Sequence, residues 1–148
     1  MANYSTRLKA FRDSLESLSE IEKITITELG EDFIGLKGFI WCGIIAKFSI
    51  TLDLSWKLMK DLLIEEHKVF NFAKGSPKEV LQKSYEANII SEHTWAEMLQ
   101  VRNEISHQYK NLEIVDEWCE KIITTYIPLF YGLLKYAEGL ANEHKQKQ

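Results

Sequence analysis

The chain has 148 residues, of which 45% are hydrophobic and 27% are charged, values typical of one compact soluble domain covering residues 1–148. Its 18 basic and 22 acidic side chains give a formal charge of −4, which excludes a globally positive surface for non-specific nucleic-acid binding. Any RNA or nucleotide site must therefore be local, and we expect no DNA binding.

Three observations bear on where the protein acts. Arg7 and Arg12 precede any long apolar stretch, which does not fit a signal peptide. The longest unbroken apolar run, residues 39–46, is far shorter than the roughly 20 residues that span a bilayer. Cys42 and Cys119 fall in apolar, helical sequence, where thiols are usually buried and reduced. We therefore expect a cytoplasmic protein with no transmembrane helix.

Helix breakers are scarce, since the chain has two prolines and seven glycines, and this favours a few long helices over many short strands. The first predicted helix covers residues 4–19, because apolar side chains recur there at the helical interval: Leu8, Phe11, Leu15 and Leu18. Residues 20–38 are predicted to form a connecting loop, because residues 24–27 alternate like a short strand and three glycines lie nearby: Gly30, Gly35 and Gly38.

A second helix is predicted over residues 39–66. The stretch at residues 48–54 alternates between apolar and polar side chains, which on its own favours a strand. A strand as long as the whole segment is implausible, so length decides for a helix. Apolar side chains on more than one face of this helix indicate more than one packing partner. They keep the helical interval throughout: Trp41, Ile45, Phe48, Leu52, Trp56, Met59 and Leu63.

A third helix has a clear start. Ser76 is suited to cap it, Pro77 fits the first turn, and Glu79 occupies the third position of a capping box. The helix is predicted to end near Asn88, a residue that tolerates the left-handed conformation of a helix stop.

Ser91 is predicted to cap a fourth helix that ends near residue 106 or 107, and Asn111 to cap a last long helix. Pro128 should kink that last helix, and the polar tail at 142–148 is expected to fray. Helices joined by short connections predict an all-α fold, an antiparallel up-and-down bundle of four main helices plus a shorter helix.

The most unusual polar cluster lies at the end of the fourth helix. At about 100° per residue, Asn103 and His107 share one helix face, and Arg102 lies roughly 140° from His107. A slight unwinding there would bring all three residues to one rim. Histidine can exchange a proton near neutral pH, arginine can hold a phosphate, and Asn103 could orient either one.

These groups suit a metal-independent ribonuclease, because RNA supplies its own nucleophile in the 2′-hydroxyl. The alternative reading is that Arg102 and His107 are ordinary cations placed against the helix C-terminal dipole. Spacing alone favours this alternative.

Other chemistries find no support in the sequence. His67, His93 and His144 have no thiol or carboxylate at ligand spacing, so we expect no metal site and no cofactor. The sequence contains no phosphate-binding loop, nucleophile elbow or C-x-x-C motif. Lys57 and Lys60 beside Trp56 fit either a phosphate contact or a solvated face, and the solvated face is the commoner case.

The chain resembles the HEPN family, and within it the nucleotidyltransferase substrate-binding proteins. Residues 48–57 (Phe-Ser-Ile-Thr-Leu-Asp-Leu-Ser-Trp-Lys), 76–80 (Ser-Pro-Lys-Glu-Val), 95–99 (Trp-Ala-Glu-Met-Leu) and 102–109 carry the resemblance. The family usually has glutamates where this chain has Ser49 and Asp53. Its defining motif is an arginine, usually followed by asparagine, then a spacer, a histidine, any residue and a tyrosine. Arg102, Asn103, His107 and Tyr109 match that motif in full.

The resemblance implies a HEPN-like bundle that forms a homodimer, with two copies of the motif facing one cleft. It further implies a partner, a minimal nucleotidyltransferase (MNT), that is typically encoded beside the HEPN protein. In many such pairs the HEPN protein resembles an RNase toxin, with RNA as substrate, and the MNT protein its antitoxin. The partner is expected to transfer AMP from ATP to Tyr109 and thereby silence the cleft.

Two functional hypotheses follow, and a third is less favoured. In the first, the protein is an endoribonuclease toxin: His107 is the general base or acid, Arg102 holds the phosphate, and Asn103 positions them. In the second, the protein is a noncatalytic subunit that presents a nucleotide or other substrate to the MNT partner. In the third, it is a helical adaptor with a vestigial motif. The intact motif favours the nuclease.

Overall fold

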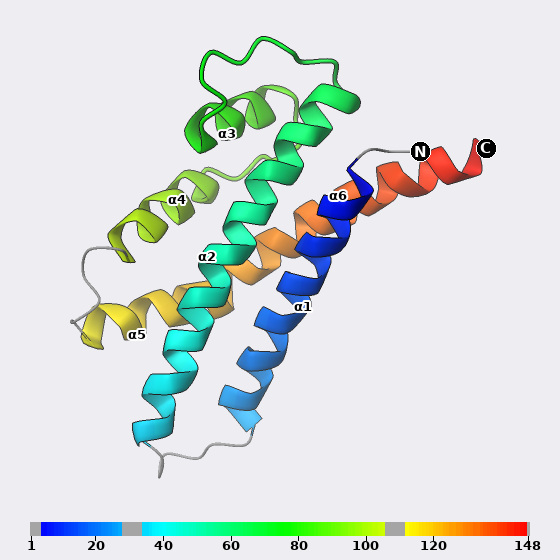
Figure 1. Cartoon of the computed structure of the whole chain (residues 1–148). Coiled ribbons are helices and arrows are strands. Elements are labelled where there is room, and N and C mark those ends of the chain that lie inside the picture. Colours follow the sequence, from blue (N-terminus) through cyan, green and yellow to red (C-terminus); the bar gives the residue numbers. More distant parts are fainter. Residues whose placement is uncertain (1–3, 28–33, 106–111, 148) are drawn as a thin grey trace.

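The computed structural model describes residues 4–27, 34–105 and 112–147, and every regular element in these ranges is helical (Figure 1). The elements are α1 (Ser5–Thr27), α2 (Ile34–Glu65), α3 (Pro77–Glu86), α4 (Thr94–Ile105), and a continuous helix made of α5 (Leu112–Lys121), the π-helix η1 (Ile122–Tyr126) and α6 (Ile127–Gln146). The predicted all-α fold is confirmed, with five helices packed against one another.

Helix α2 is the central element of the bundle. It contacts α1, α3, α4, α5 and α6, and α1 also packs against α6. Helix α1 lies alongside α2 and runs antiparallel to it (Figure 1). Several partners around one helix explain why α2 carries apolar residues on more than one face.

By length and composition alone, residues Gly38–Glu65 of α2 would be able to cross a membrane. This stretch is nevertheless the central helix of the bundle, and two of its three acidic residues pair with other helices. Asp53 pairs with Arg102 on α4, and Asp61 pairs with Arg7 on α1. Helix α2 therefore makes the contacts of a core helix.

The predicted loop between the first two helices is wrong at both ends. The segment expected to be a loop, residues 20–38, is helical up to Thr27 and again from Ile34. Helix α1 continues because Ile21 follows Leu18 at the helical interval and packs partly against the core. Gly38 is exposed within α2, so its missing side chain leaves no gap in the core.

The alternating stretch at residues 48–54 is helical, as its length predicts. Its polar side chains are satisfied locally, because the hydroxyls of Ser49 and Thr51 donate to the carbonyls of Ile45 and Lys47, four residues earlier. Thr51 is fully buried and also shares a 2.7 Å hydrogen bond with Ser14 of α1. These bonds let polar residues occupy buried helical positions, so the alternation does not indicate a strand.

Helix α3 begins as predicted. The hydroxyl of Ser76 accepts from the backbone N–H of Glu79 at 3.3 Å, and Pro77 is the first residue of the helix. The Glu79 carboxylate reaches back past the cap, and hydrogen bonds from the preceding turn lower its pKa. The three backbone N–H groups that donate to it belong to Ala73, Lys74 and Gly75.

The connection from α3 to α4 confirms one prediction and corrects another. Asn88 adopts a φ of 61°, the left-handed conformation expected after the helix. Ser91 is not the cap of α4, which begins three residues later at Thr94. The turn before α4 is closed instead by the carbonyl of Glu92, which accepts from the N–H of Trp95.

The last helix widens immediately before Pro128. In η1, the N–H of Ile127 donates to the carbonyl of Ile122, five residues earlier. A proline ring clashes with the preceding turn of a regular α-helix, and the wider turn accommodates it. Ile122, Tyr126 and Phe130 are all fully buried. Their spacing of four residues would carry them about 80° around a straight α-helix, and the π-helix keeps them on one side. The structure shows this widened turn ahead of Pro128, and the predicted kink itself stays a prediction. The proposed cap, Asn111, lies outside the described residues.

Helix α6 extends to Gln146, through the tail expected to fray from residue 142. The imidazole Nε2 of His144 lies 2.6 Å from the Glu66 carboxylate, which also accepts from the hydroxyl of Tyr4 at 2.8 Å. These contacts hold the end of α6 against α2 and the start of α1.

The two cysteines have different environments. Cys119 is buried as predicted, and burial raises the pKa of its thiol to about 12. Cys42 is exposed, contrary to expectation, because it lies on a solvent-facing side of α2. Both cysteines are free.

Candidate functional site

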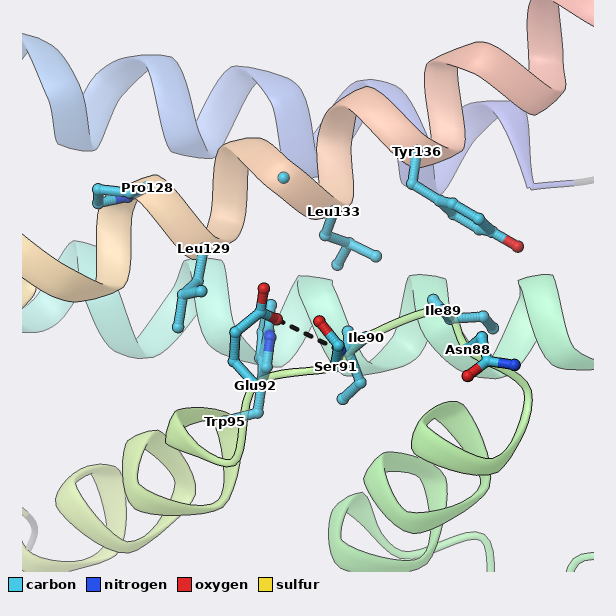
Figure 2. A pocket seen from close by; sticks show the side chains of 11 residues that line it. Asn88, Ile89, Ile90, Ser91, Glu92, Trp95, Pro128, Leu129, Leu133 and Tyr136 are labelled. Atoms are coloured by element: carbon cyan, nitrogen blue, oxygen red, sulfur yellow. Dashed lines mark hydrogen bonds between the residues drawn. The ribbon is translucent and has the colours of Figure 1, made fainter.

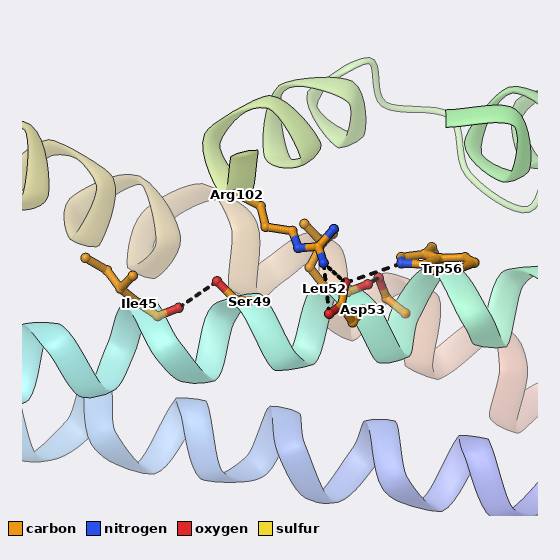
Figure 3. A network of polar contacts seen from close by, with 7 residues as sticks. Ile45, Ser49, Leu52, Asp53, Trp56 and Arg102 are labelled. Atoms are coloured by element: carbon orange, nitrogen blue, oxygen red, sulfur yellow. Dashed lines mark hydrogen bonds and ion pairs between the residues drawn. The ribbon is translucent and has the colours of Figure 1, made fainter. Parts of the chain in front are cut away.

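Arg102 and Asp53 form the polar centre of the candidate site (Figure 3). The guanidinium Nη2 of Arg102 lies 2.8 Å from Oδ1 of Asp53 and 3.1 Å from Oδ2. The indole N–H of Trp56 donates to Oδ1 of the same carboxylate at 3.4 Å. One carboxylate on the central helix therefore holds both the arginine of the motif and a neighbouring aromatic ring.

The packing of α4 determines where Arg102 lies. Four apolar side chains of this short helix are buried in the core: Trp95, Met98, Val101 and Ile105. Arg102 directly follows Val101, so its side chain leaves at the edge of this buried face, next to α2. About a third of it is accessible to solvent, at 32%. The arginine is thus anchored at its base and accessible at its tip.

A second polar contact fixes α4 to the long C-terminal helix. The Glu97 carboxylate pairs with Lys121 of α5, and the hydroxyl of Tyr126 in η1 donates to it at 3.0 Å. The hydrogen bond from Lys121 is the main reason that the pKa of Glu97 is lowered. Burial, together with the bond to Glu97, raises the pKa of Tyr126 above its ordinary value. Glu97 therefore holds α4, the helix that carries Arg102, against the long C-terminal helix.

The positions where the family usually has glutamates differ in their contacts. Asp53, although shorter, supplies a carboxylate that reaches Arg102. Ser49, one turn earlier on α2, donates its hydroxyl to the Ile45 carbonyl at 3.1 Å (Figure 3). The site therefore retains one carboxylate from α2 at these two positions.

The remaining motif residues are only partly described. Asn103 is exposed, and its side chain makes no hydrogen bond to another residue within the described ranges. His107 and Tyr109 lie outside the described residues, so the predicted grouping of Arg102, Asn103 and His107 stays a prediction.

The Arg102 side chain retains the capacity to bind a phosphate. Only its Nη2 contacts Asp53, and within the described residues the Nε and Nη1 groups have no hydrogen-bond acceptor. A guanidinium held on one edge by a carboxylate can present its other N–H groups to an anion with little loss of side-chain entropy. Asp53 therefore orients the guanidinium and leaves its Nε and Nη1 groups without a protein partner among the described residues.

A pocket of about 240 Å³ lies elsewhere, between the α3–α4 connection and α6 (Figure 2). Trp95, Leu129 and Leu133 line its apolar side, and Asn88 and Glu92 contribute polar groups. Arg102 is not among its lining residues. Within the part of the chain that the structure covers, no three histidine, cysteine or acidic side chains are grouped to hold a metal.

The role of Asp53 was not predicted from the sequence. The family position identified it as an acidic residue that replaces glutamate, but helical periodicity does not show which residue of another helix it meets. Glu97 was likewise part of a recognised stretch without an assigned contact. For both Asp53 and Glu97, the available signal in the sequence was an acidic residue next to the apolar face of a predicted helix.

The fold and this site define an all-α bundle in which a pre-oriented arginine projects from the fourth helix. A family model described as nucleotidyltransferase substrate binding protein like matches residues 6–138, and the chain belongs to this HEPN-type family. The name of the family implies association with a nucleotidyltransferase. A search of curated proteins found no match.

Proposed function

We propose that this protein is the HEPN component of a toxin–antitoxin pair and acts in the cytoplasm as a metal-independent endoribonuclease. Arg102 holds the scissile phosphate and stabilises its developing charge. His107 exchanges protons with the 2′-hydroxyl and the leaving oxygen, and Asn103 positions the two. The observation that carries the proposal is the guanidinium of Arg102, held on one edge by Asp53 and accessible on the other.

The proposal includes a homodimer, for which the surface of α2 provides support. An apolar stripe of α2, defined as Phe39, Cys42, Ala46 and Ile50, recurs at helical intervals and is exposed, with Phe39 at 80% and Ile50 at 51%. Asp53 follows Ile50 by three residues, so the stripe leads directly to the residue that holds Arg102. A second copy docked on this stripe would bring two Arg102 side chains to one cleft.

Control by a minimal nucleotidyltransferase completes the proposal. In the partner's active site, the hydroxyl of Tyr109, two residues from His107, attacks the α-phosphate of ATP, so that AMP is attached to the tyrosine oxygen and pyrophosphate leaves. The added phosphate would place negative charge where the RNA phosphate binds and thereby silence the site.

A second function is favoured by the family description itself. A noncatalytic subunit would use Arg102 to bind the phosphate of a nucleotide or another substrate and present it to the nucleotidyltransferase. The same arginine serves both functions, so only the chemistry at His107 separates them.

An RNA cleavage assay in EDTA tests the proposal. Wild type should cleave RNA and leave 2′,3′-cyclic phosphate ends, whereas His107→Ala and Arg102→Met should not. Arg12→Met is the matched control, because Arg12 pairs with Glu138 at 2.7 Å and is similarly exposed, at 36% against 32% for Arg102. No cleavage by wild type whose Tyr109 carries no AMP, checked by mass spectrometry, would favour the binding subunit.

A further inference from the structure

Beside the Arg102 site, α2, α3 and the connection between them carry a surface of lysines and aromatic rings that the proposed chemistry does not use. We name it the lysine–aromatic surface and define it as Trp56, Lys57, Lys60, Phe72 and Lys83. Cation–π contacts join its members in two groups, one around Trp56 and one around Phe72. The ammonium of Lys57 lies 5.8 Å from the Trp56 ring centroid, and those of Lys60 and Lys83 lie 5.4 and 5.7 Å from the Phe72 ring centroid.

The surface is continuous with the Arg102 site. Asp53, Trp56 and Lys60 follow one another at intervals of three and four residues, so they lie on one face of α2. Trp56 donates to the carboxylate that holds Arg102, and its ring extends along α2 away from the arginine (Figure 3). From Asp53 to Lys60 the helix rises about 10 Å, a distance that a few nucleotides can cover.

The lysines of this surface are available to an anion. Within the described residues, no carboxylate lies within 4.0 Å of the ammonium of Lys57, Lys60 or Lys83. Asp61 interacts electrostatically with Lys60, and Glu79 with Lys83, but neither carboxylate forms an ion pair with these lysines, and each has other partners. Asp61 pairs with Arg7 at 3.2 Å, and Glu79 accepts three backbone N–H groups.

The ammonium groups of Lys60 and Lys83 both lie beside the ring of Phe72, although like charges repel each other. The ammonium of Lys60 lies against the turn at Gly75, where even a Cβ atom would come within 2.9 Å of it. Lys60 therefore approaches the Phe72 ring from α2 beside this turn, and Lys83 approaches the same ring from α3. Asp61 and Glu79 interact electrostatically with Lys60 and Lys83, but the two ammonium groups beside the Phe72 ring form no ion pair within the described residues and can contact an anionic ligand directly.

We propose that the lysine–aromatic surface binds the stretch of single-stranded RNA that adjoins the phosphate held by Arg102. This inference rests on the proposed function. Aromatic faces flanked by cations suit a single strand, because bases stack on the rings while the ammoniums contact the phosphates. The surface would give the site a preference for longer strands over the shortest substrates.

Binding is tested with a fluorescent RNA strand of about 12 nucleotides, a length within the range of known single-strand sites. Its 2′-hydroxyls carry methyl groups, so it cannot be cleaved. The test variant is Lys60→Met with Lys83→Met, which keeps the apolar stems against Phe72. The control is Lys9→Met with Lys135→Met, two exposed lysines on α1 and α6 whose loss changes the net charge equally.

We expect the test variant to bind about tenfold more weakly than wild type near 0.1 M salt. The slope of log K against the logarithm of the salt concentration should be less steep by about 1.4, the value for two lost phosphate contacts on a single strand. The control should bind like wild type. Equal affinities for the test variant and the control, with unchanged circular dichroism, would overturn the proposal. So would displacement of the RNA by polyglutamate as effectively as by unlabelled RNA, since the surface would then be a docking site for acidic protein.

A cleavage assay separates this inference from the proposed function. The test variant should show a raised KM for a long RNA and unchanged kinetics for a dinucleotide, which reaches only Arg102. If wild type cleaves neither substrate, the nuclease proposal fails, and the binding measurement still decides whether the surface holds RNA.

Discussion

The Nη2 atom of Arg102 lies within hydrogen-bond distance of both carboxylate oxygens of Asp53, at 2.8 and 3.1 Å. This single nitrogen ties the helix that carries the motif to the central helix of the bundle. The rest of the guanidinium is left for other ligands. Orientation rather than stability is the main consequence, because ion pairs this accessible contribute only about 0.2–1 kcal/mol.

Replacing Asp53 tests that consequence. Asp53→Asn should change the free energy of unfolding by no more than about 1 kcal/mol. It should lower RNA cleavage by about tenfold or more, because the guanidinium loses its fixed orientation. Asp53→Glu should restore most of the activity, since a carboxylate is again present. Asp61→Asn, which breaks the pair with Arg7, is the control and should leave cleavage unchanged.

The apolar stripe of α2 predicts a disruptable dimer. Ile50→Glu places a charge on the stripe and should convert the dimer to a monomer, with little effect on folding because Ile50 is exposed. Sedimentation equilibrium measures the mass directly. A wild-type mass equal to one chain at micromolar concentration would contradict the dimer itself.

Tyr109→Phe removes the hydroxyl that would accept AMP. We expect the variant to remain an active nuclease that the partner nucleotidyltransferase no longer neutralises. Co-expression and growth measure this, and mass spectrometry of wild type should show the mass of one AMP on Tyr109. Neutralisation of the variant as effective as that of wild type would indicate masking of the cleft instead.

Substitution of Phe130 should destabilise the core strongly, because its ring lies near those of three other buried aromatic residues: Phe11, Phe48 and Trp95. Phe130→Ala should lower the free energy of unfolding by about 3–5 kcal/mol. Phe70→Ala is the control, because its side chain is 69% exposed, and it should change stability by no more than about 0.5 kcal/mol. Urea unfolding followed by circular dichroism measures both.

The pair of Glu97 with Lys121 predicts a pH dependence. The pKa of Glu97 is lowered from its ordinary value of 4.5, so the folded state favours the charged form. Its contribution to stability is present above that value and is lost as the pH falls through the lowered pKa. Glu97→Gln should therefore be less stable than wild type near pH 7, and the difference should narrow below about pH 4. A constant difference across this range would contradict the assignment.

Much of this fold was predictable from local signals. The helical interval of Leu8, Phe11, Leu15 and Leu18 predicted a buried face of α1, and all four are buried. The start of α3 and the left-handed Asn88 also followed from local chemistry.

The errors arose where local and tertiary signals conflict. Glycines and alternation suggested a loop over residues 20–38, but Ile21 finds a place against the core and the helix continues. Ser91 has the chemistry of a cap, yet the turn closes at Glu92. The pairing of Asp53 with Arg102 depends on how two helices are placed, which no periodicity within one helix specifies.

The π-helix at Ile122–Tyr126 gives the long C-terminal helix one residue more than a regular α-helix would need over the same span. Removing one of the exposed residues Thr124 or Thr125 would return this segment to seven residues for two turns, so Ile122 and Phe130 would keep nearly the same alignment. A deletion anywhere else along the helix would rotate all that follows by about 100°. Chain length in α5 and α6 is therefore strictly constrained, and η1 is the single described place where a one-residue deletion preserves the register of both halves.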